Sequence, residues 1–205
     1  LEVQKPTIIV KYRLVTLLFL LPFLAMAQER GAGVRLGEPF SLTYKDFFDD
    51  YISWELMVGS GGVNGNSYYQ RDFENNPPAS NAFYIGHSAK KGASIHGRIA
   101  LHEDITDMFE ITEGYLLGYA GIGAQLRSTR VNYSYSQGQV GGPGLVPRTE
   151  ERSNIDFGPE LFGGAEYYFS EAPISVFAEV GFFLELLDRV GHIKGQGGIG
   201  VRYLF

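Results

Sequence analysis

The sequence contains no cysteine, so neither disulfide bonds nor thiolate metal ligands are available to it. In an exported protein this absence excludes a small fold held together by disulfides. Positive charge is also scarce, because 17 Lys and Arg residues stand against 23 Asp and Glu residues, which gives a net charge of −6. An acidic chain without a basic excess argues against nucleic acid as a partner.

Long apolar runs are absent apart from one near the start of the chain. This run covers residues 14–24, about 11 residues, whereas a helix needs roughly 20 to span a bilayer. Lys5, Lys11 and Arg13 precede the run, and Ala25-Met26-Ala27 follows it. This order of basic, apolar and small residues is typical of a secretory signal peptide. We therefore predict cleavage after Ala27.

The predicted leader, residues 1–27, leaves a single domain of residues 28–205. The leader carries a net charge of +2, so the domain that remains has a charge of −8. All 27 glycines lie in this domain, and the chain also has 13 tyrosines and 15 phenylalanines. Abundant glycine and aromatic residues suit short strands, turns and the aromatic girdles of a membrane interface. No segment of the domain approaches 18 consecutive apolar residues, so we expect no transmembrane helix.

The last stretch of the chain, residues 195–205, has the clearest periodicity. Side chains alternate between the two faces of a strand. Here one face is apolar and aromatic, and the other holds glycine, arginine and leucine; the two sets are Ile199, Val201, Tyr203 and Phe205, and Gly200, Arg202 and Leu204. Apolar-out and polar-in alternation is typical of a strand in an outer-membrane barrel.

The same alternation predicts seven more strands. The eight predicted strands cover residues 31–37, 40–48, 51–59, 93–102, 114–135, 155–169, 174–186 and 195–205. A helical turn over residues 42–49 is an alternative to the second strand. An even number of strands is the rule for single-chain bacterial barrels.

Two long polar stretches separate these strands, at residues 60–92 and 137–152. They contain turn signals such as Gly61-Gly62, Asn64-Gly65 and Gly141-Gly-Pro-Gly144. If both chain ends face the periplasm, both long loops lie outside the cell and the shorter connections lie on the periplasmic side. This is the arrangement typical of outer-membrane barrels. We expect the two loops to form an external interaction surface.

The leader, the eight alternating strands and the terminal Gly200-Val-Arg-Tyr-Leu-Phe205 together resemble the small outer-membrane β-barrel proteins, the group that includes OmpA- and OmpX-like barrels. The resemblance covers residues 28–205. It implies an all-β, transmembrane, antiparallel up-and-down barrel in the outer membrane, with outer-membrane lipid as a partner. The last strand, which ends in Phe205, resembles the signal recognised by the barrel-assembly machinery. Proteins of this group include adhesins, envelope-stabilising proteins, small transport barrels and lipid-modifying enzymes, so the activity stays open.

Charged residues gather on the face opposite the apolar side chains and are expected inside the barrel. They are Arg35, Lys45, Glu55, Arg98, Asp156, Glu160, Glu166, Glu179, Glu185 and Arg202. The interior of an eight-stranded barrel is just wide enough for its side chains to fill. A buried charge without a partner is costly, so we expect these residues to pair across the lumen. The alternative is a narrow polar conduit or a small-ligand site.

The spacing of the candidate residues favours neither a catalytic site nor a metal site. His96 and His102 lie six residues apart on one strand, roughly 20 Å, and cannot bind one metal. Ser94, His96 and Glu55 would suit a lipid hydrolase, but Ser94 and His96 are about 6.5–7 Å apart between α-carbons, a poor start for the contact that a nucleophile and its base need. We therefore predict no catalytic, cofactor-binding or metal-binding residues and no cofactor.

The glycines at 195, 197 and 200 match a dinucleotide-binding fingerprint by letter only, because the helix that this motif requires cannot follow. The leading hypothesis is a non-enzymatic, porin-like outer-membrane barrel with a surface interaction or envelope-structural role. Three alternatives remain. One is a barrel enzyme acting on envelope lipid, another a narrow channel for small solutes, and the third an exported soluble barrel that binds an apolar ligand inside, with its charged face outward.

Overall fold

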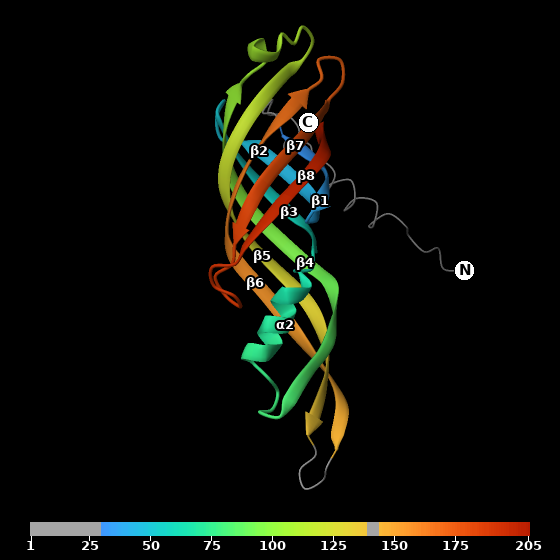
Figure 1. Ribbon diagram of the computed structural model, residues 1–205. Coiled ribbons are helices and arrows are strands. Elements are labelled where there is room, and N and C mark those ends of the chain that lie inside the picture. Colours follow the sequence, from blue (N-terminus) through green and yellow to red (C-terminus); the bar gives the residue numbers. More distant parts are fainter. Residues whose placement is uncertain (1–29, 139–143) are drawn as a thin grey trace, which may run out of the picture.

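The computed structural model describes residues 30–138 and 144–205, which form a closed barrel of eight antiparallel strands (Figure 1). The strands are β1 (Gly31–Glu38), β2 (Phe40–Phe47), β3 (Ile52–Gly61), β4 (Ala82–Asp104), β5 (Tyr115–Gly138), β6 (Leu145–Tyr168), β7 (Ile174–Leu184) and β8 (Ile193–Leu204). Each strand pairs with its neighbours in sequence, and β1 closes the ring against β8. The prediction of an eight-stranded up-and-down barrel is confirmed. The predicted signal peptide lies outside the described residues.

The barrel is apolar outside and polar inside. On β7, the outward Val180 is 70% exposed, whereas the neighbouring Glu179 is 5% exposed. The outward side chains of the barrel wall are almost all apolar, while most of its fully buried residues are charged or polar. This inverts the pattern of a soluble protein, in which charged residues are almost never fully buried. The alternative of a soluble barrel with an apolar interior is therefore wrong.

The strands differ strongly in length, and this difference shapes the molecule. β4, β5 and β6 have 23, 24 and 24 residues, whereas the other five strands have 8 to 12. The three long strands continue as a twisted sheet far beyond the rest of the barrel (Figure 1). We call the end of the barrel with Arg30 and Phe205 the proximal end, the opposite end the distal end, and this sheet the distal extension.

A helix, α2 (Asn66–Asn75), lies against the distal extension. Its buried residues Tyr68, Tyr69 and Phe73 pack on Val131, Tyr133 and Tyr135, which are on the inward face of β5. The helix therefore lies on the inner side of the extension, where it covers the mouth of the barrel.

The predicted loops at residues 60–92 and 137–152 are corrected by this arrangement. The first contains α2 and the start of β4, and the second is mostly strand, because β5 runs to Gly138 and β6 begins at Leu145. Most outward positions of the distal extension are polar, as at Arg130, Asn132 and Ser134 of β5, although Phe83 and Leu145 are exposed and apolar. The strict apolar alternation therefore ends before the strands do. The helical alternative for residues 42–49 is also wrong, since β2 runs to Phe47.

The proximal connections, at residues 48–51, 105–114 and 169–173, are short. One of them contains a 3₁₀ turn, η2 (Asp107–Phe109). The connection that holds α2 lies at the distal end. No helix among residues 30–138 and 144–205 is long and apolar enough to cross a bilayer.

Candidate functional site

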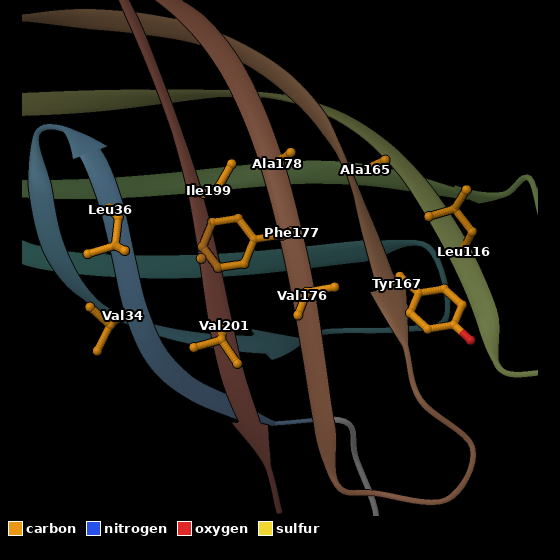
Figure 2. Close-up of a pocket in the computed structure, with 11 residues that line it drawn as sticks. Val34, Leu36, Leu116, Ala165, Tyr167, Val176, Phe177, Ala178, Ile199 and Val201 are labelled. Atoms are coloured by element: carbon orange, nitrogen blue, oxygen red, sulfur yellow. The ribbon is translucent and has the colours of Figure 1, made fainter.

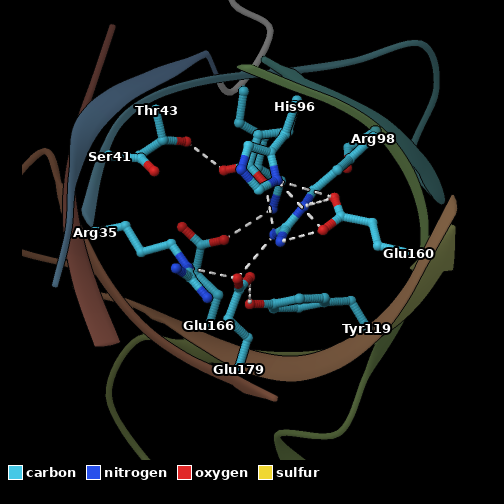
Figure 3. Close-up of polar contacts among 12 residues, drawn as sticks. Arg35, Ser41, Thr43, His96, Arg98, Tyr119, Glu160, Glu166 and Glu179 are labelled. Atoms are coloured by element: carbon cyan, nitrogen blue, oxygen red, sulfur yellow. Dashed lines mark hydrogen bonds and ion pairs between the residues drawn. The ribbon is translucent and has the colours of Figure 1, made fainter. Parts of the chain in front are cut away.

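The lumen of the barrel is filled by a network of buried charges (Figure 3). Its members are four cations and four carboxylates: Arg35, Lys45, Arg98 and Arg202, and Glu55, Glu160, Glu166 and Glu179. They come from several different strands, so the network ties opposite walls together. Because the two signs are equal in number, the network can be neutral without added counterions, as a buried charge cluster requires.

Arg98 lies at the centre of the network. Its Nε donates to Glu160 Oε1 at 2.5 Å, and its Nη1 donates to Glu179 Oε1 at 2.8 Å. The guanidinium also lies 4.3 Å from the centre of the Phe162 ring. Glu179 accepts a further bond from Arg35 Nε at 2.7 Å, so the two arginines share one carboxylate. β1, β4, β6 and β7 are joined through these contacts.

Arg202 holds the proximal half of the network. It forms ion pairs with Glu55 and, at 2.7 Å, with Glu166. Glu166 also accepts from Lys45 Nζ at 2.8 Å and from Ser175 Oγ at 2.5 Å. The Arg202 guanidinium lies 3.8 Å from the centre of the Phe177 ring, so the cation is packed as well as paired.

The network is densely packed, because each of its eight residues is at most 7% exposed. A cavity beside it has a volume of about 10 Å³ and is lined by Lys45, His102, Tyr119 and Arg202 among others. A volume of this order holds about one water molecule. Among the described residues, the charged network thus packs the inside of the barrel as a core.

A second polar cluster lies at the distal mouth, around Arg127 and Asp156. Arg127 Nε donates to Asp156 Oδ2 at 2.7 Å, and Arg127 Nη2 donates to Asn64 Oδ1 at 2.9 Å. From α2, the Tyr68 hydroxyl donates to Glu185 Oε1 at 2.6 Å. Glu185 lies just beyond the end of β7, so these bonds tie the helix to the rim of the barrel.

Burial dominates the electrostatics of this mouth. It raises the pKa of the Glu185 carboxyl, and the charges of Asp156 and Asp188 act in the same direction. Burial likewise raises the pKa of the Tyr68 phenol, with the bond to Glu185 adding to the shift. Both shifts favour the neutral forms, so burial favours a Tyr68 hydroxyl that donates to Glu185.

Aromatic packing fixes the rest of α2. The rings of Phe73 and Tyr133 lie 5.3 Å apart, and those of Phe73 and Tyr135 lie 5.5 Å apart. The Tyr133 hydroxyl donates to Asp72 Oδ2 at 2.8 Å. Arg152 of β6 lies over both Phe73 and Tyr133, at 5.6 and 5.3 Å from the ring centres. The helix is therefore held by β5 and β6 as a plug over the lumen.

All ten charged residues expected inside the barrel are buried, and most are paired as expected. Glu185 differs in that it lies at the mouth, after β7, and not on a strand. Arg127 and Tyr119 were not predicted as interior residues, because glycine and alanine obscure the period of residues 118–123. A usable signal was the alternation of Gln125, Arg127 and Thr129 with Leu126, which continues the inward face of β5.

The hydrolase set is not assembled. Ser94 and His96 are both buried inside the barrel, and Glu55 is engaged by Thr43 and Arg202. The acid that contacts His96 is Glu160, at 3.3 Å from Nδ1. His102 contacts Ser53 Oγ through Nε2 at 2.8 Å, away from His96. Among the described residues, no group of three or more His, Cys, Asp or Glu residues has an arrangement that holds a metal ion.

The outer wall is shaped for an apolar surrounding. A hollow of about 620 Å³ runs across β1, β8, β7 and β6 (Figure 2). Small residues such as Ala165 and Ala178 form its floor, and larger ones such as Leu36 and Ile199 stand around them. At the proximal end aromatic rings gather, with Tyr44 5.4 Å from Trp54 and 6.4 Å from Phe205. Such rings are typical of the girdle at a membrane interface.

A closed ring of strands leaves no unpaired edge in the wall, which is the condition for crossing the hydrocarbon of a bilayer. Together with the apolar wall and the charged interior, it defines a transmembrane β-barrel of the outer-membrane type. The resemblance to the small OmpA-like barrels is thereby confirmed at the level of architecture.

No family model and no curated protein sequence matches the chain. Among solved structures, the N-terminal β-barrel domain of Pseudomonas aeruginosa OprF is similar, with 13% identity, a TM-score of 0.47, and coverage of 87% of this chain and 96% of that chain. Acinetobacter baumannii CarO2 has 14% identity, a TM-score of 0.41, and coverage of 86% and 98%. A major outer membrane protein from Thermus thermophilus has 10% identity, a TM-score of 0.46, and coverage of 88% and 100%. The fold assignment therefore rests on the strand pairing of this chain itself.

Proposed function

We propose that this protein is an outer-membrane barrel with a closed lumen that presents the distal extension outside the cell as an interaction surface. The observation that carries the proposal is the contrast between its two halves. Charged side chains fill the barrel where its outward face is apolar, a region that we call the apolar band. Beyond the band, three paired strands and a packed helix form an ordered platform.

The edge of the apolar band can be followed on β5 and β6. Leu126 and its partner Phe157 are both exposed apolar residues on the outer face. Two pairs further towards the distal end, Arg130 and Ser153 take the same outward positions and are exposed. The change from apolar to polar within about 13 Å of strand supports a bilayer boundary here. The extension beyond it therefore stands in water.

The extension has features that support binding to a partner. Residues 82–91 of β4 pair with β5 on one side only, because β3 pairs with β4 at residues 92–101. Phe83 and Ile85 on this free edge are 58% and 61% exposed. A free edge with exposed apolar side chains can accept an added strand from another chain. In contrast, the free part of β6 carries Pro147 and several charges, which discourage such pairing.

The experiment that tests this placement is labelling of single cysteines on intact cells, which the absence of native cysteine makes clean. Ser134→Cys lies on the distal extension, and Ser170→Cys lies in the proximal turn between β6 and β7. A maleimide that cannot cross membranes should label the first variant and leave the second unlabelled until the cells are opened. The reverse pattern, or equal labelling, would refute the proposal.

A further inference from the structure

Two cations lie directly opposite each other on the outer face of the distal extension. Lys90 of β4 is the cross-strand partner of Arg130 of β5. Both are exposed, and Arg130 shares its face of β5 with the outward Leu126. Side chains of directly opposed residues lie about 5 Å apart at their β-carbons, and like charges in this position are destabilising. The fold itself does not explain why two cations face each other at this position.

The Lys90–Arg130 pair lies next to the distal edge of the apolar wall. On β5 and β6, the outward pair before Arg130 and Ser153 is Ser128 and Ile155, and Ile155 is 47% exposed. One step of two residues is about 7 Å along a strand, or about 5 Å along the normal of a bilayer when the strand is tilted as in a barrel. The headgroup layer on each side of a bilayer is about 5–7 Å thick. Lys90 and Arg130 are thus at headgroup level.

The described residues supply no counter-charge to this pair. In the described part of the chain, neither Lys90 nor Arg130 has an ion pair within 4 Å, whereas the four cations of the lumen network are all paired. The acid nearest in the register is Glu151, which lies opposite Asn132, one step further from the apolar wall. Lys91, the next residue along β4, is also exposed and without an ion pair among these residues. An acidic chain thus gathers unpaired positive charge at one level of its surface.

We propose that Lys90 and Arg130 together bind the phosphate group of an anionic lipid headgroup in the leaflet at the distal end. Arginine offers two parallel donors to phosphate oxygens, and lysine adds a compact charge. The long side chains reach back towards the bilayer while their heads remain in the polar layer. The inference rests on the proposed placement of the barrel in a membrane, and it adds a specific lipid-phosphate site to that placement.

The test uses the full chain reconstituted in phosphatidylcholine bilayers that contain a small fraction of spin-labelled lipid. The preference of the barrel surface for spin-labelled phosphatidic acid over spin-labelled phosphatidylcholine is measured. Each basic residue near an anionic surface contributes an attraction equivalent to roughly five-fold in binding. The native chain should prefer phosphatidic acid several-fold, and Lys90→Gln/Arg130→Gln should lose most of this preference.

The control is Arg71→Gln/Arg148→Gln, which removes the same charge from exposed positions on α2 and near the start of β6, distant in the register from Lys90. It should retain the preference of the native chain. Equal losses in the two double variants, or no preference in the native chain, would overturn the proposal. Abolition of the preference by inorganic phosphate, added at the same concentration as the spin-labelled phosphatidic acid, would also overturn the proposal. The site would then bind the free ion in place of the lipid. A chain that fails to insert, seen as an unshifted band on unheated gels, would instead refute the membrane placement.

Discussion

Glu179 shows at the scale of single residues why the lumen depends on complete pairing. Its carboxylate accepts from Arg35 and Arg98, and the Tyr119 hydroxyl donates to it at 3.3 Å. Glu179→Gln removes the negative charge that these two arginines share. Breaking a buried pair by removing one partner costs about 3–5 kcal/mol, because the other charge is left uncompensated.

We therefore expect Glu179→Gln to lower the free energy of unfolding by about 3 kcal/mol or more, measured by urea titration of the protein folded in detergent micelles. The matched control is Ser94→Ala, also fully buried inside the barrel but with no hydrogen-bond partner for its Oγ among the described residues. It should cost less than about 1 kcal/mol. Equal costs for the two variants would show that the charges do not act as a network.

Glu185 gives a prediction on pH. Burial raises the pKa of its carboxyl above the ordinary value of 4.5, so the folded protein binds a proton that the unfolded chain releases. The stability contributed by this group is full below 4.5 and is lost as the pH rises through the raised value. Glu185→Gln keeps an oxygen for the Tyr68 hydroxyl and should remove this loss. Unfolding measured across the acidic range should show a flatter pH dependence for the variant; an unchanged slope would contradict the assignment.

At the scale of elements, α2 is the part that the sequence did not predict. Polar and glycine-rich residues surround it, and its buried residues Tyr68, Tyr69 and Phe73 have a partner surface only because β5 and β6 continue into the distal extension. Their continuation was missed for a related reason: outside the bilayer an outward position can be polar, as at Asn132 and Ser134, so strand and loop have similar compositions.

The strands inside the bilayer were predictable because the membrane forces a strict alternation on them. The strands β7 and β8 agree with prediction to within two residues at each end. The ten interior charges followed from the same alternation. Their individual partners did not, because pairing across a lumen depends on the register and tilt of strands that are distant in sequence.

The packing of α2 predicts that this helix can be released without opening the barrel. Phe73 is 1% exposed, and loss of a buried phenylalanine costs about 3–5 kcal/mol. Phe73→Ala should therefore speed protease cleavage near residues 66–75 in the folded protein, while the heat-shifted gel mobility of the barrel stays unchanged. Gln70→Ala, at an exposed position of the same helix, should leave cleavage at the native rate. Loss of the shifted band in Phe73→Ala would mean that the helix is required for the barrel itself.

The terminal strand closes the ring. β8 pairs with both β7 and β1, and the Phe205 N–H donates to Arg30 O at 2.9 Å. Deletion of residues 195–205 would leave two edges unpaired in hydrocarbon, where each unsatisfied backbone group costs several kcal/mol. The deletion should abolish the folded, heat-modifiable fraction in outer membranes. Removal of Phe205 alone should reduce that fraction, because we propose that this residue is part of the signal for the barrel-assembly machinery. Normal insertion of the longer deletion would refute the barrel.

At the scale of the whole molecule, the outer wall, the lumen and the distal extension differ in chemistry. The apolar wall, including the hollow over β1 and β6–β8, faces lipid, and the charged network fills the lumen. We propose that the distal extension carries the interaction surface. A water-filled pore would need a continuous path through the lumen. The network around Arg98 and the plug of α2 stand in series across that path.

The most direct test of the closed lumen is a planar-bilayer recording of the native chain, with insertion verified by heat-shifted mobility of the same sample. The cavity of about 10 Å³ beside the network predicts no large, stable conductance steps. Glu179→Gln should not open a pore of porin size either, because the remaining side chains still fill an eight-stranded barrel. Stable, porin-sized steps from the inserted native protein would contradict the closed lumen and, with it, the assignment of function to the distal extension.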